Sequence, residues 1–374
     1  MNIRTFIHPG RTFLPCSGVG RHINGVLGAL GEIEDTGLKL LFAEEWLCND
    51  GRLPPSCPLR DLPFQTFPGR ESRRERLWKL INHPKMDRYV DGDTDWIYCP
   101  METRVPVRKC PAAITLHDVQ PFETKLPWSS GKQHQRNRRM WGLWLPKVLK
   151  ECRVIFTVSE FSKQRMVELL CVPPEKVVIS GNGVDPAFFF AGAVTADIEV
   201  PPHPYIFTVG GLRTQKGGEY FLAVARLLRK TIPDLRFVVA GGPHDPVLVS
   251  EAKRIGGFEF PGMVPEEALP LLMKGASCLL FLSLYEGFGM PPLEAMACGT
   301  PAIVADRASL PEVVGGAAMI VDPEAAEPIA ELIGELMSDS AFRDTLIAKG
   351  RKHAAEYTWE RVAERVHSTL QERS

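Results

Sequence analysis

Residues 276–323 read ASCLLFLSLYEGFGMPPLEAMACGTPAIVADRASLPEVVGGAAMIVDP, and this stretch contains the pattern that decides the fold. An apolar run is followed by a loop with Gly287 and Gly289, then by a short helical segment and a second apolar run. The prolines at 291 and 292 lack the amide donors that a first helical turn leaves unbonded, and Gly299 suits the position just past a helix end. The stretch therefore predicts a strand, a glycine loop, a short helix over 292–298 and another strand.

The same alternation of short apolar runs and helical patterns continues outward along the chain. It is typical of parallel sheets built from right-handed β-α-β units, so we expect an α/β fold in both halves. Other helices are expected over 218–231 and 265–275. The expected strands are 2–8, 38–43, 96–100, 112–116, 154–158, 177–179, 205–209, 236–240, 277–281 and 301–305.

The length of the chain indicates two domains. A single core stops growing near roughly 250 to 300 residues, and this chain has 374. Residues 186–204, with the tract VPPHP, suit a connector better than a helix or central strand. We therefore expect an N-terminal Rossmann-like domain over 1–190, a C-terminal one over 191–355 and a last helix within 356–374. Apolar residues at helical spacing predict that this helix, over 359–371, packs one apolar face against the rest of the protein. The residues of this face are Trp359, Val362, Ala363, Val366 and Leu370.

The composition narrows the class of protein. Hydrophobic residues make up 44% and charged residues 24%, which is ordinary for a globular protein. There is no stretch of about 18 consecutive apolar residues that could span a bilayer, and the N-terminus lacks the pattern of a secretory signal. The nine cysteines include no C-x-x-C pair, so we expect reduced thiols and a cytoplasmic location. A net charge of -1 gives no general attraction for nucleic acid.

The glycine loop carries the first candidate site. Gly287 and Gly289 allow the backbone to approach a ligand closely, and the free amides of the following helix favour an anion such as a diphosphate. Glu286 is expected to close the strand, and Glu294 is expected in the first helical turn. Carboxylates there are suited to accept hydrogen bonds from sugar or ribose hydroxyls.

The E-x7-E pattern from Glu286 to Glu294, with the AMACGTPAIVADRASLPEVVG that follows, resembles the retaining glycosyltransferases of family 4, which include sucrose synthase and many bacterial mannosyltransferases. Further motifs occur in the family's order: GVGR at 18–21, LHD at 116–118, TVSEFS at 157–162, NGVD at 182–185 and VGGLRTQKGG at 209–218. The resemblance implies the GT-B fold, in which two Rossmann-like domains face each other across a ligand cleft and the C-terminal helix crosses back to the first domain.

The resemblance also implies roles for residues of the second half. Glu294 corresponds to the carboxylate that holds the nucleotide ribose, and Glu286 to the one that contacts hydroxyls of the transferred sugar. Arg213 and Lys216 correspond to the basic pair that clamps the diphosphate, although the spacing before Lys216 is one residue shorter than usual. Backbone groups complete the expected donor site: the amides of Gly287, Phe288, Gly289 and Met290 for sugar and phosphate, and the chain around Met263 and Val264 for the base.

In the first half, the resemblance implies that Gly18 and Gly20 lie in a loop facing the donor. His117 corresponds to a histidine beside the reacting sugar, and we expect it to project into the cleft opposite the diphosphate.

Two other patterns have competing interpretations. DGDTDW, residues 91–96, contains D-x-D patterns that hold a metal in a different glycosyltransferase architecture, but a polar turn before a strand is the simpler explanation. Residues 131–150 contain six Lys+Arg and no acid, with Trp141 and Trp144 among them. This stretch suits either a helix with a solvated basic face or peripheral contact with the inner face of a membrane.

The expected function is a metal-independent, cofactor-free retaining transfer of a hexose from a nucleotide sugar to a glycan or lipid-linked acceptor, in polysaccharide or glycolipid biosynthesis. Mannose is the leading sugar. GVGRHING lacks the glycine spacing of a dinucleotide site, so no NAD is implied. The alternatives are a sugar-nucleotide epimerase or hydrolase of the same fold, and an inactive nucleotide-sugar-binding protein.

Overall fold

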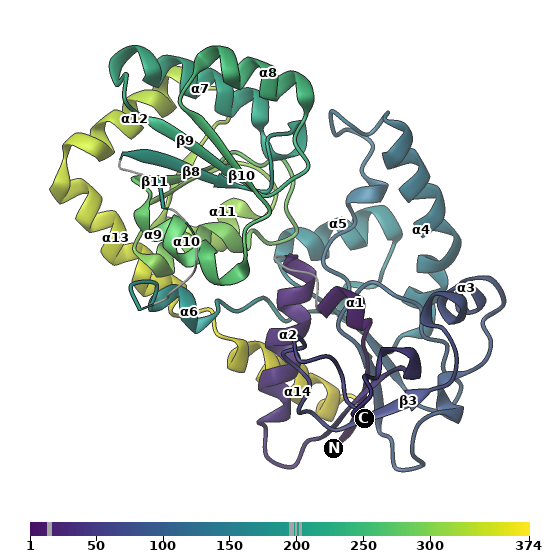
Figure 1. Cartoon of the computed structure of the whole chain (residues 1–374). Coiled ribbons are helices and arrows are strands. Elements are labelled where there is room, and N and C mark those ends of the chain that lie inside the picture. Colours follow the sequence, from purple (N-terminus) through teal and green to yellow (C-terminus); the bar gives the residue numbers. More distant parts are fainter. Residues whose placement is uncertain (13–16, 194–197, 199, 202–203) are drawn as a thin grey trace. The chain divides into compact units, whose positions relative to one another are not determined.

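The computed structural model describes residues 1–12, 17–193, 198, 200–201 and 204–374. The chain divides into two compact units (Figure 1), the first made of Met1–Gly183 with Trp359–Ser374 and the second of Val184–Thr358. Each unit is built around one parallel sheet with helices packed on it. Among the helices that the structure describes, none combines the length and the apolar composition needed to cross a membrane.

The first unit contains a seven-stranded sheet in the order β3-β2-β1-β4-β5-β6-β7, with every pair parallel. Its order reverses between β1 and β4. The strands are β1 (Asn2–Phe6), β2 (Gly37–Ala43), β3 (Phe64–Phe67), β4 (Trp96–Cys99), β5 (Ala112–Thr115), β6 (Val154–Thr157) and β7 (Val177–Ile179). The helices are α1 (Pro9–Thr12), α2 (Gly18–Gly31), α3 (Glu71–Ile81), α4 (Lys132–Glu151), α5 (Glu160–Leu170) and α14 (Trp359–Glu372).

The second unit contains a six-stranded parallel sheet in the order β10-β9-β8-β11-β12-β13. The strands are β8 (Tyr205–Val209), β9 (Arg236–Ala240), β10 (Phe258–Gly262), β11 (Cys278–Phe281), β12 (Ala302–Ala305) and β13 (Met319–Val321). Helices α7 (Gly218–Thr231), α8 (Pro246–Ile255) and α12 (Ala326–Ser338) cover one face, and α9 (Leu269–Gly275) and α10 (Met290–Cys298) the other (Figure 1). The remaining helices are α6 (Pro186–Phe189), α11 (Leu310–Val314) and α13 (Ser340–Ala354).

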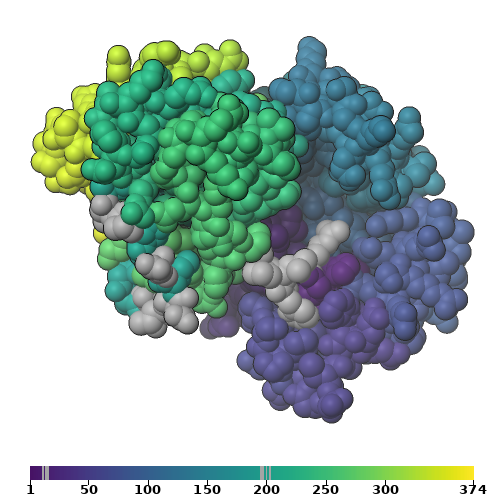
Figure 2. Space-filling view, turned by 45° about the horizontal axis from the view of Figure 1, so that its top comes forward, coloured from purple at the N-terminus to yellow at the C-terminus, as the bar shows by residue number. Residues whose placement is uncertain are grey.

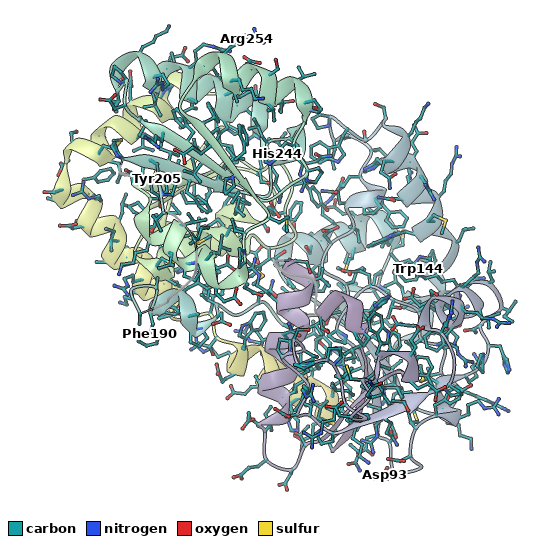
Figure 3. All side chains as sticks on the ribbon, in the orientation of Figure 1. Asp93, Trp144, Phe190, Tyr205, His244 and Arg254 are labelled. Atoms are coloured by element: carbon teal, nitrogen blue, oxygen red, sulfur yellow. The ribbon has the colours of Figure 1, made fainter. Side chains whose placement is uncertain are left out.

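Side chains fill the space between sheet and helices in both units (Figure 3). Tyr205, the first residue of β8, is fully buried, and its hydroxyl donates a 2.7 Å hydrogen bond to the carbonyl of Leu272 in α9. A buried hydroxyl without a partner would cost free energy, so this bond lets an aromatic residue occupy the core.

Every strand expected from the sequence is present, within two residues at either end. The prediction missed β3, β10 and β13, which are all outermost strands of their sheets. Their residues are mostly only partly buried, so they lack the continuous apolar run that marks a central strand. The presence of Pro261 within β10 is consistent with an edge position, where no ladder hydrogen bond is lost.

The connector over 186–204 was predicted to be non-helical, and this was wrong at its start. Residues Pro186–Phe189 form α6, because Asp185 caps the helix by accepting a hydrogen bond from the Ala187 amide and proline is favoured at the first position. Part of this connector, residues 194–197, 199 and 202–203, lies outside the described residues.

The C-terminal helix α14 packs against α2 and so belongs to the first unit. Its apolar stripe, from Trp359 to Leu370, is buried as expected from the spacing. The Trp359 ring lies so close to α2 that a Cβ atom on Gly25 would come within 2.2 Å of it. Gly25 is therefore required by close packing.

We predict that Gly25→Ala destabilises the protein by roughly 1 to 3 kcal/mol, because the methyl group would displace the Trp359 ring. Gly28→Ala, in the same helix, is the matched control because, apart from its chain neighbours and the nearby backbone of its own helix, nothing lies within 4 Å of the position of its Cβ. It should stabilise the protein by up to about 1 kcal/mol, since alanine favours a helix. Urea unfolding measures both changes, and equal effects of the two substitutions would contradict this packing argument.

Candidate functional site

The candidate site of the second unit lies at the carboxyl ends of its strands. The strand order reverses between β8 and β11, and ligands of open α/β sheets bind at such a reversal. Loops after four neighbouring strands meet this edge: residues 210–217 after β8, 241–245 after β9, 263–265 after β10 and 282–289 after β11. Most of the sequence-predicted residues of this half lie on these loops.

The loop after β8 depends on glycines with left-handed backbone. Gly211 has φ +80°, and a Cβ atom there would lie 2.3 Å from the carbonyl oxygen of Pro243. Gly217 has φ +68°, and its Cβ would lie 2.0 Å from the carbonyl oxygen of Leu282. Glycine alone permits both the conformation and the close approach. The second contact draws the short helix Thr214–Lys216 against the loop that follows β11.

The structure brings Lys216 and Glu286 together as an ion pair. Their side chains are 20% and 17% exposed, and Lys216 Nζ also lies 5.4 Å from the centre of the Phe281 ring. Burial lowers the pKa of Arg213, while the charge of Glu286 acts in the opposite direction. The three residues thus form one cluster with two cations and one carboxylate at the reversal of strand order.

The loop containing Glu286 is fixed through its backbone. The Ser309 hydroxyl lies 2.9 Å from the carbonyl of Glu286 and 2.7 Å from that of Phe288, so its single proton can be donated to either or shared between them. The Leu284 amide donates to the carbonyl of Gln215 at 3.0 Å. We expected Glu286 to close the strand, and this was wrong: β11 ends at Phe281 because these contacts turn the chain away from the sheet.

Helix α10 begins at Met290 after Gly289, whose φ is +100°, and ends at Cys298, where Gly299 follows in the left-handed conformation, as the prolines and glycines predict. Glu294 was expected in the first helical turn, but the helix begins two residues earlier than predicted, so Glu294 lies in the second turn. Its side chain is 1% exposed. Burying a carboxylate carries a large desolvation cost, which is common at sites with a function.

The base-binding segment proposed around Met263 and Val264 follows β10 directly. Met263 is 59% exposed and Val264 is buried. Beside it, sequence reasoning missed His244, whose ring lies 5.1 Å from the Phe260 ring and whose Nδ1 accepts the Leu212 amide at 3.0 Å. Burial lowers the pKa of His244. Its position in GGPHD directly after a strand was the available signal.

In the first unit, His117 follows β5 and lies at the carboxyl edge of the sheet. Its backbone N–H and its ring Nδ1 both contact Glu102 Oε1, at 2.8 and 2.7 Å. Burial alone would raise the pKa of Glu102, but the charge of His117 and these hydrogen bonds lower it to about 2. The carboxylate is therefore ionised, and His117 Nδ1 carries the proton that it donates.

A second histidine, His22 from α2, completes this cluster. Its ring lies edge-on to that of His117 with centroids 4.6 Å apart, and its Nδ1 is 2.7 Å from Asn182 Oδ1. Burial and the nearby charge of His117 lower the pKa of His22 to about 3, so His22 is neutral near pH 7. Sequence reasoning missed both Glu102 and His22, although His22 directly follows the GVGR motif.

Gly18 and Gly20 were expected in a loop, and this was wrong. Both lie in the first turn of α2, because Ser17 caps the helix and accepts the Gly20 amide at 2.9 Å. The D-x-D carboxylates lie before β4, at the opposite edge of the sheet. Asp91 is bonded to Lys39 at 2.9 Å and Asp93 to Arg4 at 3.2 Å, which supports the interpretation as a structural turn.

Comparison with known proteins agrees with this architecture. The solved structure of a sucrose-phosphate synthase from Thermosynechococcus elongatus matches with a TM-score of 0.68 and 17% identity, covering 99% of this chain and 98% of that one. HepE from Anabaena, solved in complex with UDP and glucose, matches with a TM-score of 0.64 and 14% identity over the full length of both chains. Two Rossmann-like units with parallel sheets and a returning C-terminal helix define a protein of the GT-B fold.

The sequence comparisons then identify the family. Residues 41–188 match the model described as Glycosyltransferase Family 4, and residues 197–353 match Glycosyl transferases group 1. The chain is 29% identical to the O-antigen chain mannosyltransferase B of Escherichia coli over 291 residues, 74% of this chain and 75% of that protein. It is 28% identical to the MMP alpha-(1->4)-mannosyltransferase of Mycolicibacterium hassiacum, over 58% of this chain and 53% of that protein. The chain belongs to the family 4 glycosyltransferases.

We predict that Lys216 and Glu286 stabilise each other by roughly 1 to 3 kcal/mol, because each would otherwise leave a mostly buried charge unpaired. A double-mutant cycle with Lys216→Met and Glu286→Gln, followed by urea unfolding, measures this coupling. The more exposed pair Arg226–Glu251 is the control, and its coupling free energy should be less than about 1 kcal/mol. Additive effects at Lys216 and Glu286 would show that the two charges are independent.

We predict that the neutral state of His22 makes the protein less stable in mild acid. The folded-state pKa, about 3, is below the ordinary value, so below pH 6.5 only the unfolded chain takes up the proton. At pH 5 this costs roughly 2 kcal/mol relative to pH 7. The lowered pKa of Glu102 changes the free energy of unfolding mainly at more acidic pH. Unfolding free energies of the wild type and of His22→Gln at pH 7 and 5 test this, and the same pH dependence in both would exclude His22 as its source.

Proposed function

We propose that the protein is a retaining glycosyltransferase that moves a hexose from a nucleoside-diphosphate sugar to an acceptor hydroxyl. The observation that carries this proposal is the cluster of Lys216, Arg213 and Glu286 at the reversal of strand order. Two cations beside a glycine loop and the first turn of α10 suit a diphosphate. The mannosyltransferases among the relatives favour mannose as the sugar, and a role in polysaccharide or glycolipid biosynthesis.

In this proposal the diphosphate competes with Glu286 for Lys216. The ion pair holds both side chains in place before the donor binds. When a diphosphate enters, Lys216 moves its contact to the phosphate oxygens, and Glu286 becomes available to accept hydrogen bonds from sugar hydroxyls. One rearrangement thus prepares both the leaving-group contact and the sugar contact.

The rest of the donor is held by neighbouring groups. Glu294 accepts hydrogen bonds from the ribose, the amides of Gly287, Phe288, Gly289 and Met290 hold sugar and phosphate, and the chain at Met263 and Val264 contacts the base. His117, whose Nδ1–H is taken by Glu102, has Nε2 as the ring atom available to a sugar hydroxyl. Gly18 and Gly20, at the start of α2, also belong to the donor site in this proposal.

Transfer follows from charge development on the leaving diphosphate. As the bond to the sugar breaks, Lys216 and Arg213 offset the growing negative charge, and the acceptor attacks from the face that the diphosphate leaves. The leaving phosphate takes the acceptor proton. These two cations supply the positive field, so the reaction needs no metal or other cofactor.

The carboxylates argue against double displacement by a retaining glycosidase. That chemistry needs two carboxyl groups about 5 to 5.5 Å apart on either side of the reacting carbon. Here Glu286 is paired with Lys216 in a loop, and Glu294 is buried within α10. An epimerase or hydrolase that uses the same donor remains the second candidate, because the Lys216 cluster would suit its substrate equally.

The acceptor in this proposal is a glycan or a lipid-linked glycan, and no nucleic acid takes part. The basic stretch 131–150 gives the protein a peripheral contact with the inner face of the membrane where such lipids are found.

The test begins with a thermal-shift screen against GDP-mannose, UDP-glucose and ADP-glucose, since a ligand at 100 times its Kd stabilises the folded state by about 2.7 kcal/mol. The best donor is then incubated with lipid-linked and free mannosides as acceptors. We expect transfer with retained anomeric configuration by NMR, unchanged in EDTA. Turnover of donor without any acceptor would support the epimerase or hydrolase, and binding without turnover an inactive protein.

We predict that Lys216→Ala lowers kcat about 100-fold or more while weakening nucleotide binding less, because the charge that it offsets grows in the transition state. Steady-state kinetics and calorimetry with the nucleoside diphosphate separate the two effects. Lys230→Ala, a surface lysine of α7, is the control. A higher KM with an unchanged kcat would refute the leaving-group role.

A further inference from the structure

Exposed apolar side chains gather on two neighbouring helices of the first unit. Met140 and Leu143 of α4 are 49% and 67% exposed, and Leu80 and Ile81 at the end of α3 are 70% and 63% exposed. The two helices are neighbours: Lys79 Nζ lies 5.9 Å from the centre of a Trp144 ring, and Asn82, just after α3, contacts Glu151 at 3.5 Å. The space-filling view shows α4, in blue, at the surface of the first unit (Figure 2).

Basic residues surround the two apolar side chains of α4. At helical spacing, Leu143 lies four residues from Arg139 and from Lys147 and seven residues from Arg136 along one stripe, and all of these residues are exposed. The opposite face is buried in the first unit through Trp144, Leu145, Val148 and Leu149. The helix is thus anchored by one apolar face and presents a second, smaller apolar patch within a basic surface.

Within the described part of the chain, the cations of α4 have no anionic side-chain partner. Among the described residues, none of its lysines or arginines forms an ion pair: Lys132, Arg136, Arg138, Arg139, Lys147 and Lys150. Further exposed arginines, Arg70, Arg73 and Arg76, line a hollow at α3. Six unpaired cations on one helix indicate attraction to an anionic surface.

We propose that α3 and the exposed stripe of α4 form a docking surface for an anionic lipid bilayer, with Met140, Leu143, Leu80 and Ile81 entering the headgroup region. The inference rests on the proposed function in that a membrane carries lipid-linked acceptors. The structure adds Leu80 and Ile81, which the basic stretch 131–150 alone did not indicate.

A bilayer fits this surface better than a soluble polyanion does. Cations alone would suit either partner. The four large apolar side chains exposed among them would, however, stay in contact with water if the partner were a soluble polyanion. At a membrane interface they leave water while the basic groups contact anionic headgroups, which is the arrangement of interfacial helices. Each cation close to an anionic leaflet strengthens binding about fivefold.

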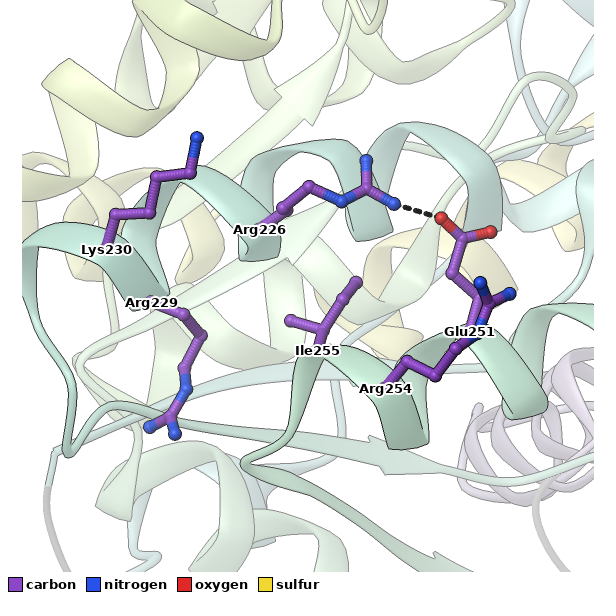
Figure 4. A pocket seen from close by; sticks show the side chains of 6 residues that line it. All are labelled: Arg226, Arg229, Lys230, Glu251, Arg254 and Ile255. Atoms are coloured by element: carbon purple, nitrogen blue, oxygen red, sulfur yellow. Dashed lines mark hydrogen bonds and ion pairs between the residues drawn. The ribbon is translucent and has the colours of Figure 1, made fainter.

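A second basic hollow provides a matched comparison. It lies between α7 and α8 of the second unit and is lined by Arg226, Arg229, Lys230, Glu251, Arg254 and Ile255 (Figure 4). There Arg226 is paired with Glu251, and Arg229 donates to the carbonyl of Leu235 at 3.3 Å. It shares the basic character of the α4 surface but not the cluster of exposed apolar residues.

The experiment is flotation of the full chain with vesicles of phosphatidylglycerol and phosphatidylcholine in equal parts, or of phosphatidylcholine alone. We expect binding only to the anionic vesicles. Arg136→Ala with Arg139→Ala should weaken it about 25-fold, following the fivefold effect of each charge. Met140→Ser with Leu143→Ser should weaken it at least fivefold at unchanged charge, and Lys230→Ala with Arg254→Ala should leave it unchanged.

Three outcomes would overturn the proposal: no binding to anionic vesicles, binding that the serine variant retains in full, or equal loss in the control on α7 and α8. The second would identify a polyanion site, tested directly by competition with soluble polyphosphate. Thermal unfolding verifies that each variant is folded. Transfer to a soluble acceptor is measured in parallel, so that a protein that transfers sugar but does not bind vesicles refutes this surface and leaves the proposed function standing.

Discussion

The position of Lys216 depends on a backbone contact that no side chain could share. Gly217 adopts a left-handed conformation and approaches the carbonyl of Leu282 more closely than any Cβ atom would permit. This contact joins the loops after β8 and β11, the two strands between which the order of the sheet reverses. Lys216 can meet Glu286 because the two loops are joined there, and the Ser309 hydroxyl fixes the backbone carbonyl of Glu286. The charge cluster is thus a consequence of backbone geometry as much as of charge.

Much of the architecture could be predicted from the sequence because its signals are local. Central strands such as β8 and β11 are buried on both faces and read as continuous apolar runs, and α10 is bounded by prolines and a glycine that act within one turn. The edge strands β3, β10 and β13 carry no such signal, since partial burial allows polar residues and proline. Glu294 lies in the second helical turn and not in the first, because the helix begins directly after Gly289, two residues before the expected start at Pro292.

The environment of His117 could not be predicted, because its partners are distant in the chain. Glu102 follows β4, His22 lies in α2 and Asn182 follows β7. Parallel strands bring these segments to one edge of the sheet, but the distances between them along the sequence do not indicate that their side chains touch. The result is a histidine whose proton is placed by a buried carboxylate, beside a second histidine kept neutral by burial. The LHD motif was enough to identify His117 as a candidate, while the structure determines which of its ring nitrogens is available for a ligand.

The return of α14 to the first unit has a consequence for how the protein forms during synthesis. The helix follows the entire second unit in the chain, yet its Trp359 ring fills the space above Gly25 and lies 6.0 Å from the ring of His22. A ribosome therefore releases the first sheet long before the segment that seals its last apolar surface. Until then the α2 face that Trp359 covers is open to water and to other chains, so the second unit can finish folding before this face is covered.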